Sequence, residues 1–106
     1  MIRHIVLVRF RPEVSDATIA KIFADLDAIR SVVPGVLAIA SGRSESPEKI
    51  ERGYMHGFTV DFAGWEALAA YQAHPDHRAV GEALVASAQS GLDGILVFDL
   101  PMSGTA

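Results

Sequence analysis

The sequence predicts a single α+β domain whose elements follow the order β-α-β-β-α-β. Four short segments rich in β-branched or aromatic residues predict strands, and stretches with apolar residues at helical spacing predict the helices between them. The chain has 106 residues, the size of one domain, and 50% of them are hydrophobic, which is enough for a core. No linker or low-complexity segment interrupts it.

The first segment, Ile2–Phe10, is predicted to be a strand because it is rich in β-branched residues and an Arg-Pro pair ends it. Side chains alternate across a strand, so His4 and Val6 share one face while Ile5 and Leu7 share the other. Both faces have apolar centres, and we therefore expect both to be covered.

The segment Ser15–Val33 is predicted to be a helix because its apolar residues recur at helical spacing and form one stripe. The stripe consists of Ile19, Ile22, Phe23, Leu26, Ile29 and Val33. Ser15 or Asp16 can cap the start of this helix, and Pro34-Gly35 ends it.

The middle of the chain is predicted to hold two strands joined by a loop. Val36–Gly42 is the second strand, and the polar segment Arg43–Gly53 has the composition of a mobile loop. Tyr54–Phe62 is the third strand, and its alternation places His56 and Phe58 on the same face.

The last third of the chain is predicted to hold two helices and a strand. Trp65–Ala73 is a short helix, a proline breaks it, and an alanine-rich helix runs from about Asp76 to Ser90. Leu96–Leu100 is the last strand, so the domain spans residues 1–101, and the tail Met102–Ala106 is expected to fray.

This order of elements is that of the ferredoxin-like fold, in which two helices cover one face of a four-stranded antiparallel sheet. The other face needs a partner, because Ile5 and Leu7 would otherwise lie in water. A symmetric homodimer with sheet facing sheet, which forms an α/β barrel, would cover them.

Composition excludes several classes of function. The net charge is -4 and no basic run occurs, so we expect no nucleic-acid partner. The chain has no cysteine, which removes disulfides, thiol nucleophiles and thiolate metal sites. Arginines interrupt the apolar run near Met1, so we expect no signal peptide and no membrane span, and a cytoplasmic protein.

The segment from Tyr71 to His77 is the best candidate for chemistry. It holds Tyr71, His74, Asp76 and His77 around a helix break, and histidine is the side chain best suited to move protons near neutral pH. The topology places His4 and His56 on the same side of the sheet as this break. The alternative is that His4 and His56 are neutral core residues with a bonded ring nitrogen, that His77 is a helix N-terminal or loop histidine in solvent, and that Tyr71 is a core aromatic.

A histidine beside a tyrosine in an apolar pocket suits removal of a proton next to a carbonyl group. Metal binding by His74, Asp76 and His77 is the competing use, but their spacing is not that of a helical ligand pair, and we expect no metal. Glycine-rich phosphate loops are absent, so we expect no nucleotide and no other cofactor.

Five segments together match the pattern of a known family. They are Met1–Phe10, Pro34-Gly35, Gly53–Phe62, Tyr71–His77 and Val97–Asp99. On these segments, residues 1–101 resemble the stress-responsive dimeric α/β-barrel (Dabb) family. The His-Pro-x-His element, with the histidine of the opening strand, is specific for the family rather than for one activity.

The resemblance implies a homodimer with a small-molecule pocket between each sheet and its helices. Similarity to a polyketide-cyclising member implies that His77 and Tyr71 are catalytic. The residues expected to line the pocket are His4, His56, Val6, Phe23, Leu26, Phe58 and His74. Smaller side chains after His77 than in that cyclase imply a different ligand.

Three functions remain open at this point. The first is cofactor-free acid/base chemistry on a small organic carbonyl compound, as a cyclase, isomerase or lyase. The second is a non-catalytic ligand-binding or stress-protective role. The third, ranked lower because no histidine stands out as an axial ligand, is a heme- or oxygen-dependent enzyme of the wider dimeric barrel superfamily.

Overall fold

The computed structural model describes residues 1–102, so the predicted tail lies outside the described residues apart from Met102. The elements follow the predicted order. They are β1 (Ile2–Val8), α1 (Asp16–Ala28), the 3-10 turn η1 (Ile29–Ser31), β2 (Val36–Arg43), β3 (His56–Phe62), α2 (Trp65–Ala73), α3 (Pro75–Ser87), the 3-10 turn η2 (Gly91–Gly94) and β4 (Ile95–Pro101).

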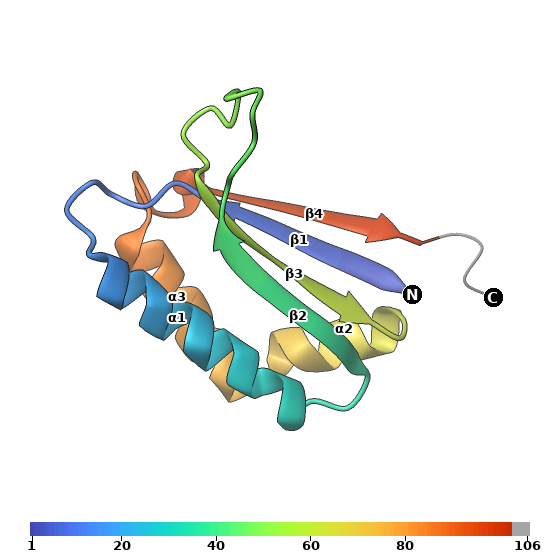
Figure 1. The fold of residues 1–106 in the computed structure, drawn as a ribbon. Coiled ribbons are helices and arrows are strands. Elements are labelled where there is room, and N and C mark those ends of the chain that lie inside the picture. Colours follow the sequence, from blue (N-terminus) through green and yellow to red (C-terminus); the bar gives the residue numbers. More distant parts are fainter. Residues whose placement is uncertain (103–106) are drawn as a thin grey trace.

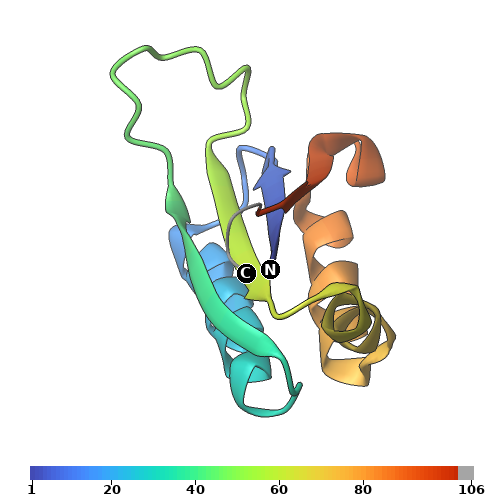
Figure 2. The same cartoon turned by 90° about the vertical axis from the view of Figure 1, so that its right-hand side faces the viewer.

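The four strands form one antiparallel sheet in the order β2-β3-β1-β4. The helices α1, α2 and α3 all lie on the same side of this sheet (Figures 1 and 2). The ferredoxin-like protomer predicted from the sequence is therefore confirmed. No helix of residues 1–102 is long and apolar enough to cross a membrane.

Two predicted strands are shorter in the structure than the sequence indicated. β1 ends at Val8, because the N–H of Arg9 donates to Gly94 O at 2.8 Å and Arg9 O accepts from Gln89 N at 2.6 Å. β3 begins at His56 instead of Tyr54, whose N–H donates to Glu51 O at 3.0 Å in a turn. Backbone bonds to the segment 89–94 thus replace sheet pairing at the end of β1, and a local turn replaces it at the start of β3.

The segment between β2 and β3, predicted as a mobile loop, is irregular and carries its own hydrogen bonds. Ser44 Oγ lies 2.5 Å from Glu51 Oε2, and Ser44 N–H donates to Met55 O at 2.7 Å. The guanidinium of Arg9 lies 5.4 Å from the centre of the Tyr54 ring.

Helix α1 starts where the capping residue predicts. Ser15 is its N-cap, and the Thr18 N–H donates to Ser15 Oγ at 3.1 Å. The α-helix ends at Ala28, and η1 replaces the last predicted turn. Gly35 then turns the chain with φ +88°, and a Cβ at this position would lie 2.6 Å from the Cβ of Ala67.

The break between α2 and α3 explains the His-Pro-x-His element. His74 has extended backbone angles, as expected before a proline, and is the N-cap of α3. The Asp76 N–H donates to His74 Nδ1 at 3.1 Å, and Pro75 occupies the first helical position, where a missing N–H costs nothing. α3 consequently starts one residue before the predicted Asp76.

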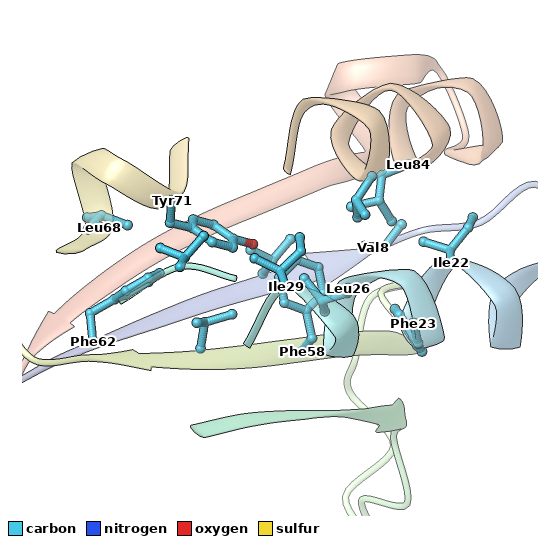
Figure 3. Close-up of a cluster of buried hydrophobic side chains, with 14 of the residues drawn as sticks. Val8, Ile22, Phe23, Leu26, Ile29, Phe58, Phe62, Leu68, Tyr71 and Leu84 are labelled. Carbon is cyan, nitrogen blue, oxygen red and sulfur yellow. The ribbon is translucent and has the colours of Figure 1, made fainter. Parts of the chain in front are cut away.

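The core lies between the sheet and the three helices (Figure 3). Its largest fully buried side chains are Tyr71, Phe62, Leu26, Ile29, Val8 and Val60. On the opposite face of the sheet, apolar side chains remain between 39% and 61% exposed in the single chain. These are Leu7, Leu96, Phe98 and Leu100. We call this surface the outer sheet face.

Candidate functional site

Tyr71 in α2 is completely buried, and its phenol oxygen is the only buried side-chain N or O atom of residues 1–102 without a hydrogen-bond partner. Figure 3 shows the ring pointing from α2 into the core. Burial raises the pKa of Tyr71, so the phenol keeps its proton and remains a donor. An unsatisfied buried donor costs about 1–3 kcal/mol, so this oxygen needs a reason to be there.

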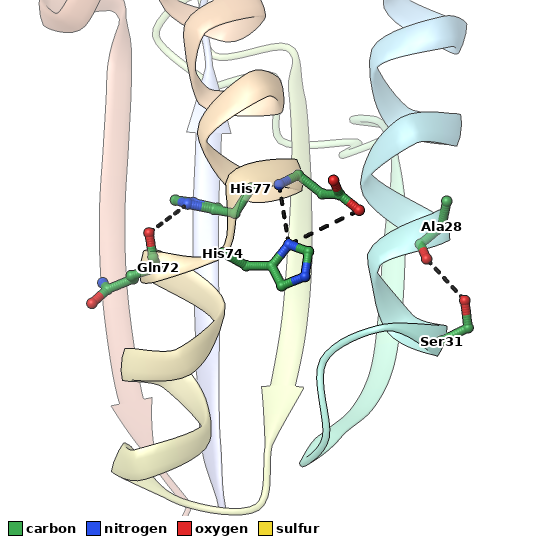
Figure 4. A network of polar contacts seen from close by, with 6 residues as sticks. Ala28, Ser31, Gln72, His74 and His77 are labelled. Carbon is green, nitrogen blue, oxygen red and sulfur yellow. Dashed lines mark hydrogen bonds and ion pairs between the residues drawn. The ribbon is translucent and has the colours of Figure 1, made fainter.

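His77 lies in the first turn of α3, beside Tyr71. Their ring centres are 4.3 Å apart. Nδ1 of His77 lies 3.3 Å from Gln72 O (Figure 4), so this nitrogen carries hydrogen and the lone pair is on Nε2. Burial lowers the pKa of His77, against the smaller opposing effect of the Gln72 O contact, which keeps the ring neutral and able to accept a proton near pH 7.

His4 of β1 lies on the other side of Tyr71. It is 5% exposed, and its ring centre is 5.8 Å from that of Tyr71 in an edge-to-face arrangement. Nδ1 of His4 donates to Asp99 Oδ1 at 2.5 Å. His4, Tyr71 and His77 form a contiguous set, which we call the His-Tyr cluster.

Asp99 was not predicted as a site residue. It stands directly opposite His4 in the β1–β4 pairing, so both side chains lie on the helix-facing side of the sheet. A carboxylate within the apolar segment Leu96–Leu100 was the available signal in the sequence. Its significance depends on which residue of β1 it pairs with, and that register was not known.

His56 lies apart from the His-Tyr cluster. Its ring contacts Phe10 at 5.2 Å and Phe23 at 6.4 Å, and its pairing partner on β1 is Val8, at the far end of the strand from His4. Burial, and then the charge of Arg43, lowers the pKa of His56. The predicted convergence of three histidines therefore reduces to two in the structure.

His74 also lies apart from the cluster, and its ring accepts a hydrogen bond from the backbone. Figure 4 shows His74 and His77 on opposite sides of the α2–α3 break. Nδ1 of His74 accepts from the Asp76 N–H, so it carries no hydrogen, and its distance of 3.9 Å from Asp76 Oδ2 is not a hydrogen bond.

The other predicted pocket residues belong to the core. Val6, Phe23, Leu26 and Phe58 are all buried. Phe58 connects the two ends of the core, because its ring centre lies 6.4 Å from that of His4 and 6.2 Å from that of Phe23.

The described pockets lie elsewhere. One of about 730 Å³ opens on the outer sheet face and includes Ile5, Leu7 and Leu96. Two others, of about 430 and 270 Å³, follow the groove between α1 and α3 and share Ile22. None of the three is lined by the His-Tyr cluster. No group of three or more His, Cys, Asp or Glu side chains in residues 1–102 is placed to hold a metal ion.

The cluster combines one hydrogen-bond donor with two acceptors in apolar surroundings. The Tyr71 phenol is the donor, and Nε2 of His4 and of His77 are the acceptors, because Nδ1 of each ring is already bonded. Such a set can polarise a carbonyl oxygen and accept a proton from a neighbouring atom.

Comparison with known proteins identifies relatives of this chain. The model of the stress responsive A/B barrel domain matches residues 2–102. The stress-response A/B barrel domain-containing protein HS1 of Arabidopsis thaliana is 30% identical over 98 residues, which cover 92% of this chain and 86% of that protein. Olivetolic acid cyclase of Cannabis sativa is 24% identical over 98 residues, covering 92% and 93%.

A solved structure shows the same fold. It is a dimeric ferredoxin-like protein of unknown function from Jannaschia sp. CCS1, 35% identical in sequence. The TM-score is 0.90, and the match covers 95% of this chain and 98% of that chain.

Proposed function

This chain belongs to the stress responsive A/B barrel domain family, and we propose that it binds a small organic carbonyl compound at the His-Tyr cluster and performs cofactor-free acid/base chemistry on it. The single observation that carries this proposal is the buried phenol oxygen of Tyr71, which has no partner. A ligand oxygen would supply the missing acceptor.

In the proposed reaction, His77 is the base. The C–H bond next to the carbonyl breaks, the proton moves to Nε2 of His77, and the electron pair moves into an enolate. Tyr71 donates a hydrogen bond to the enolate oxygen, on which negative charge develops. The lowered pKa of His77 and the raised pKa of Tyr71 support these roles, since one ring stays neutral and the other stays protonated.

The reaction class is a cyclisation, isomerisation or lyase-type step. An enolate formed in this way can attack a second carbonyl group, accept a proton at another atom or expel a leaving group. The relationship to olivetolic acid cyclase supports the first of these, and at 24% identity it does not identify the ligand of this chain.

The proposed working form is a homodimer with the two outer sheet faces in contact. The exposed Leu7, Leu96 and Phe98 support it, as does the dimeric state of the Jannaschia protein. Sedimentation over a dilution series tests the assembly, and a stable, folded monomer would contradict it.

A non-catalytic ligand-binding or stress-protective role is the second candidate. Full burial of Tyr71 and 5% exposure of His4 favour it, because both side chains also fill the core. Catalysis separates the two candidates, since a binding protein would hold a carbonyl compound without exchanging its protons.

Exchange of α-protons in heavy water tests catalysis without knowledge of the final product. The protein is incubated with a panel of small ketones and β-keto esters, and loss of the α-proton signal is followed by NMR. We expect His77→Ala to abolish catalysed exchange and Tyr71→Phe to slow it by about 10²–10³-fold. His56→Gln is the matched control, because this imidazole lies outside the cluster.

Catalysed exchange that survives in His77→Ala would exclude His77 as the base. Binding of panel compounds with no exchange in the wild-type protein would leave the second candidate as the function.

A further inference from the structure

The His4–Asp99 contact determines which ring nitrogen of His4 is available. Asp99 Oδ1 lies 2.5 Å from Nδ1, and a carboxylate can only accept, so the hydrogen is on Nδ1. In water, neutral imidazole side chains favour hydrogen on Nε2. The Asp99 contact therefore selects the less common tautomer and leaves a lone pair on Nε2.

Nε2 of His4 has no hydrogen-bond partner in the described part of the chain, where the one polar contact of this ring is that of Nδ1 with Asp99. The neighbouring Arg3 is paired with Asp61 and points to the outer sheet face. Asp99 thus bonds to His4, which presents an acceptor beside Tyr71. The ring centres of His4 and Tyr71 are 5.8 Å apart.

We propose that Asp99 is a positioning residue, and that the acceptor it creates on His4 selects carbonyl compounds that carry a hydroxyl group next to the carbonyl. This inference rests on the proposed function, since it assigns the ligand of the same cluster. Tyr71 donates to the carbonyl oxygen, His4 Nε2 accepts from the adjacent hydroxyl, and His77 Nε2 remains free to take the proton.

The selectivity arises because a ketone without the hydroxyl cannot donate a hydrogen bond to His4 Nε2. Without the hydroxyl, a bound ketone excludes water from the His4 lone pair and offers it no donor. A site that bonds a hydroxyl rejects the analogue that lacks it much more strongly than an apolar site does. Because the lone pair exists only in the tautomer that Asp99 selects, removal of the Asp99 acceptor leaves an Nε2–H, which donates to a hydroxyl oxygen and to an ether oxygen alike. The preference for a hydroxyl over its methyl ether is then lost.

A pair of probes that differ only in methylation of this hydroxyl tests the inference. Phenacyl alcohol carries the hydroxyl, and its methyl ether, 2-methoxyacetophenone, can accept but cannot donate a hydrogen bond at this position. Their dissociation constants are measured by NMR titration of the homodimer, and long-range proton–nitrogen NMR of His4 reports its tautomer. In the wild-type protein we expect phenacyl alcohol to bind at least about tenfold more tightly.

The variants separate positioning from a structural contribution. Asp99→Leu removes the acceptor, and we expect His4 to shift to the Nε2–H tautomer and the hydroxyl preference to disappear. Asp99→Asn keeps an oxygen that accepts from Nδ1, and we expect it to retain the tautomer and most of the preference. Asp93→Asn, at an exposed acidic residue of η2, is the control and should match the wild-type protein.

Two results would overturn the inference. One is a preference for phenacyl alcohol that persists in a folded Asp99→Leu variant. The other is an Nε2–H tautomer of His4 in the wild-type protein. If neither probe binds, the ligand assignment falls together with the proposed pocket. If both bind equally well at Tyr71 and His77, the pocket stands and only the hydroxyl assignment fails.

Discussion

Replacing Tyr71 with phenylalanine should stabilise the protein, although removal of a tyrosine hydroxyl from a core normally destabilises it. The phenol oxygen is fully buried and makes no hydrogen bond, so folding strips it of water without compensation. The desolvation penalty of such a group is about 1–3 kcal/mol, and Phe fills the same space without it. We therefore expect the free energy of unfolding to rise by about 1–3 kcal/mol in the absence of ligand.

Urea unfolding at fixed protein concentration, followed by circular dichroism, measures this change, because the stability of a dimer depends on concentration. Tyr54→Phe is the matched control. Its ring lies under Arg9 at 5.4 Å, and Phe keeps the aromatic face, so we expect a change near zero. A Tyr71→Phe variant that is less stable than the wild-type protein would show that the phenol is satisfied in the folded state, and the main support for a ligand site would be lost.

Two further predictions concern His56 and His77 together, and His74. Burial lowers the folded-state pKa of both His56 and His77 from 6.5, so the unfolded chain binds more protons just below that pH. The free energy of unfolding should therefore be greatest above pH 6.5, fall as the pH drops below it, and level off below the folded-state pKa values. The double variant His56→Gln/His77→Gln should have a flatter pH profile, and an unchanged slope would contradict the assigned burial. In His74→Ala the free energy of unfolding should fall by about 1 kcal/mol because the N-cap is missing, whereas in His74→Asn it should stay close to the wild-type value. Thermal melts of both variants check this. Equal losses would mean that the cap contact contributes little.

The fold could be predicted from the sequence because its signals are local. Alternation in Ile2–Phe10 and the helical stripe from Ile19 to Val33 each identify an element and its buried face without knowledge of the rest of the chain. The order of the elements then fixes the topology. Only the ends were misplaced, as at Phe10, which forms an isolated antiparallel bridge with Ala88, and at Tyr54, where a turn hydrogen bond replaces strand pairing.

The His-Tyr cluster was only partly predictable. Periodicity gives the face of the sheet on which a side chain lies, but it does not give which residue of the neighbouring strand lies opposite. His4 and His56 were assigned to the same side of the sheet, and this is where they lie. His56, however, is four residues along β3 from the partner of His4, Val60, which corresponds to about 13 Å. Strand register decides that separation, and it also decides the contact between His4 and Asp99.

His74 illustrates a different difficulty. A histidine beside Pro75 and Asp76 resembles a polar site when the sequence is considered alone. In the structure its ring replaces the serine or aspartate that usually caps a helix, and the cap sets the orientation in which α3 presents His77. A contribution to local backbone geometry and a contribution to chemistry give the same sequence pattern here.

The most direct test is a crystal structure of the homodimer soaked with phenacyl alcohol. We predict the ligand carbonyl oxygen within hydrogen-bonding distance of the Tyr71 phenol and its hydroxyl at Nε2 of His4. A ligand bound only elsewhere, with the phenol oxygen still unpartnered or bonded to a buried water, would contradict a binding site at these side chains.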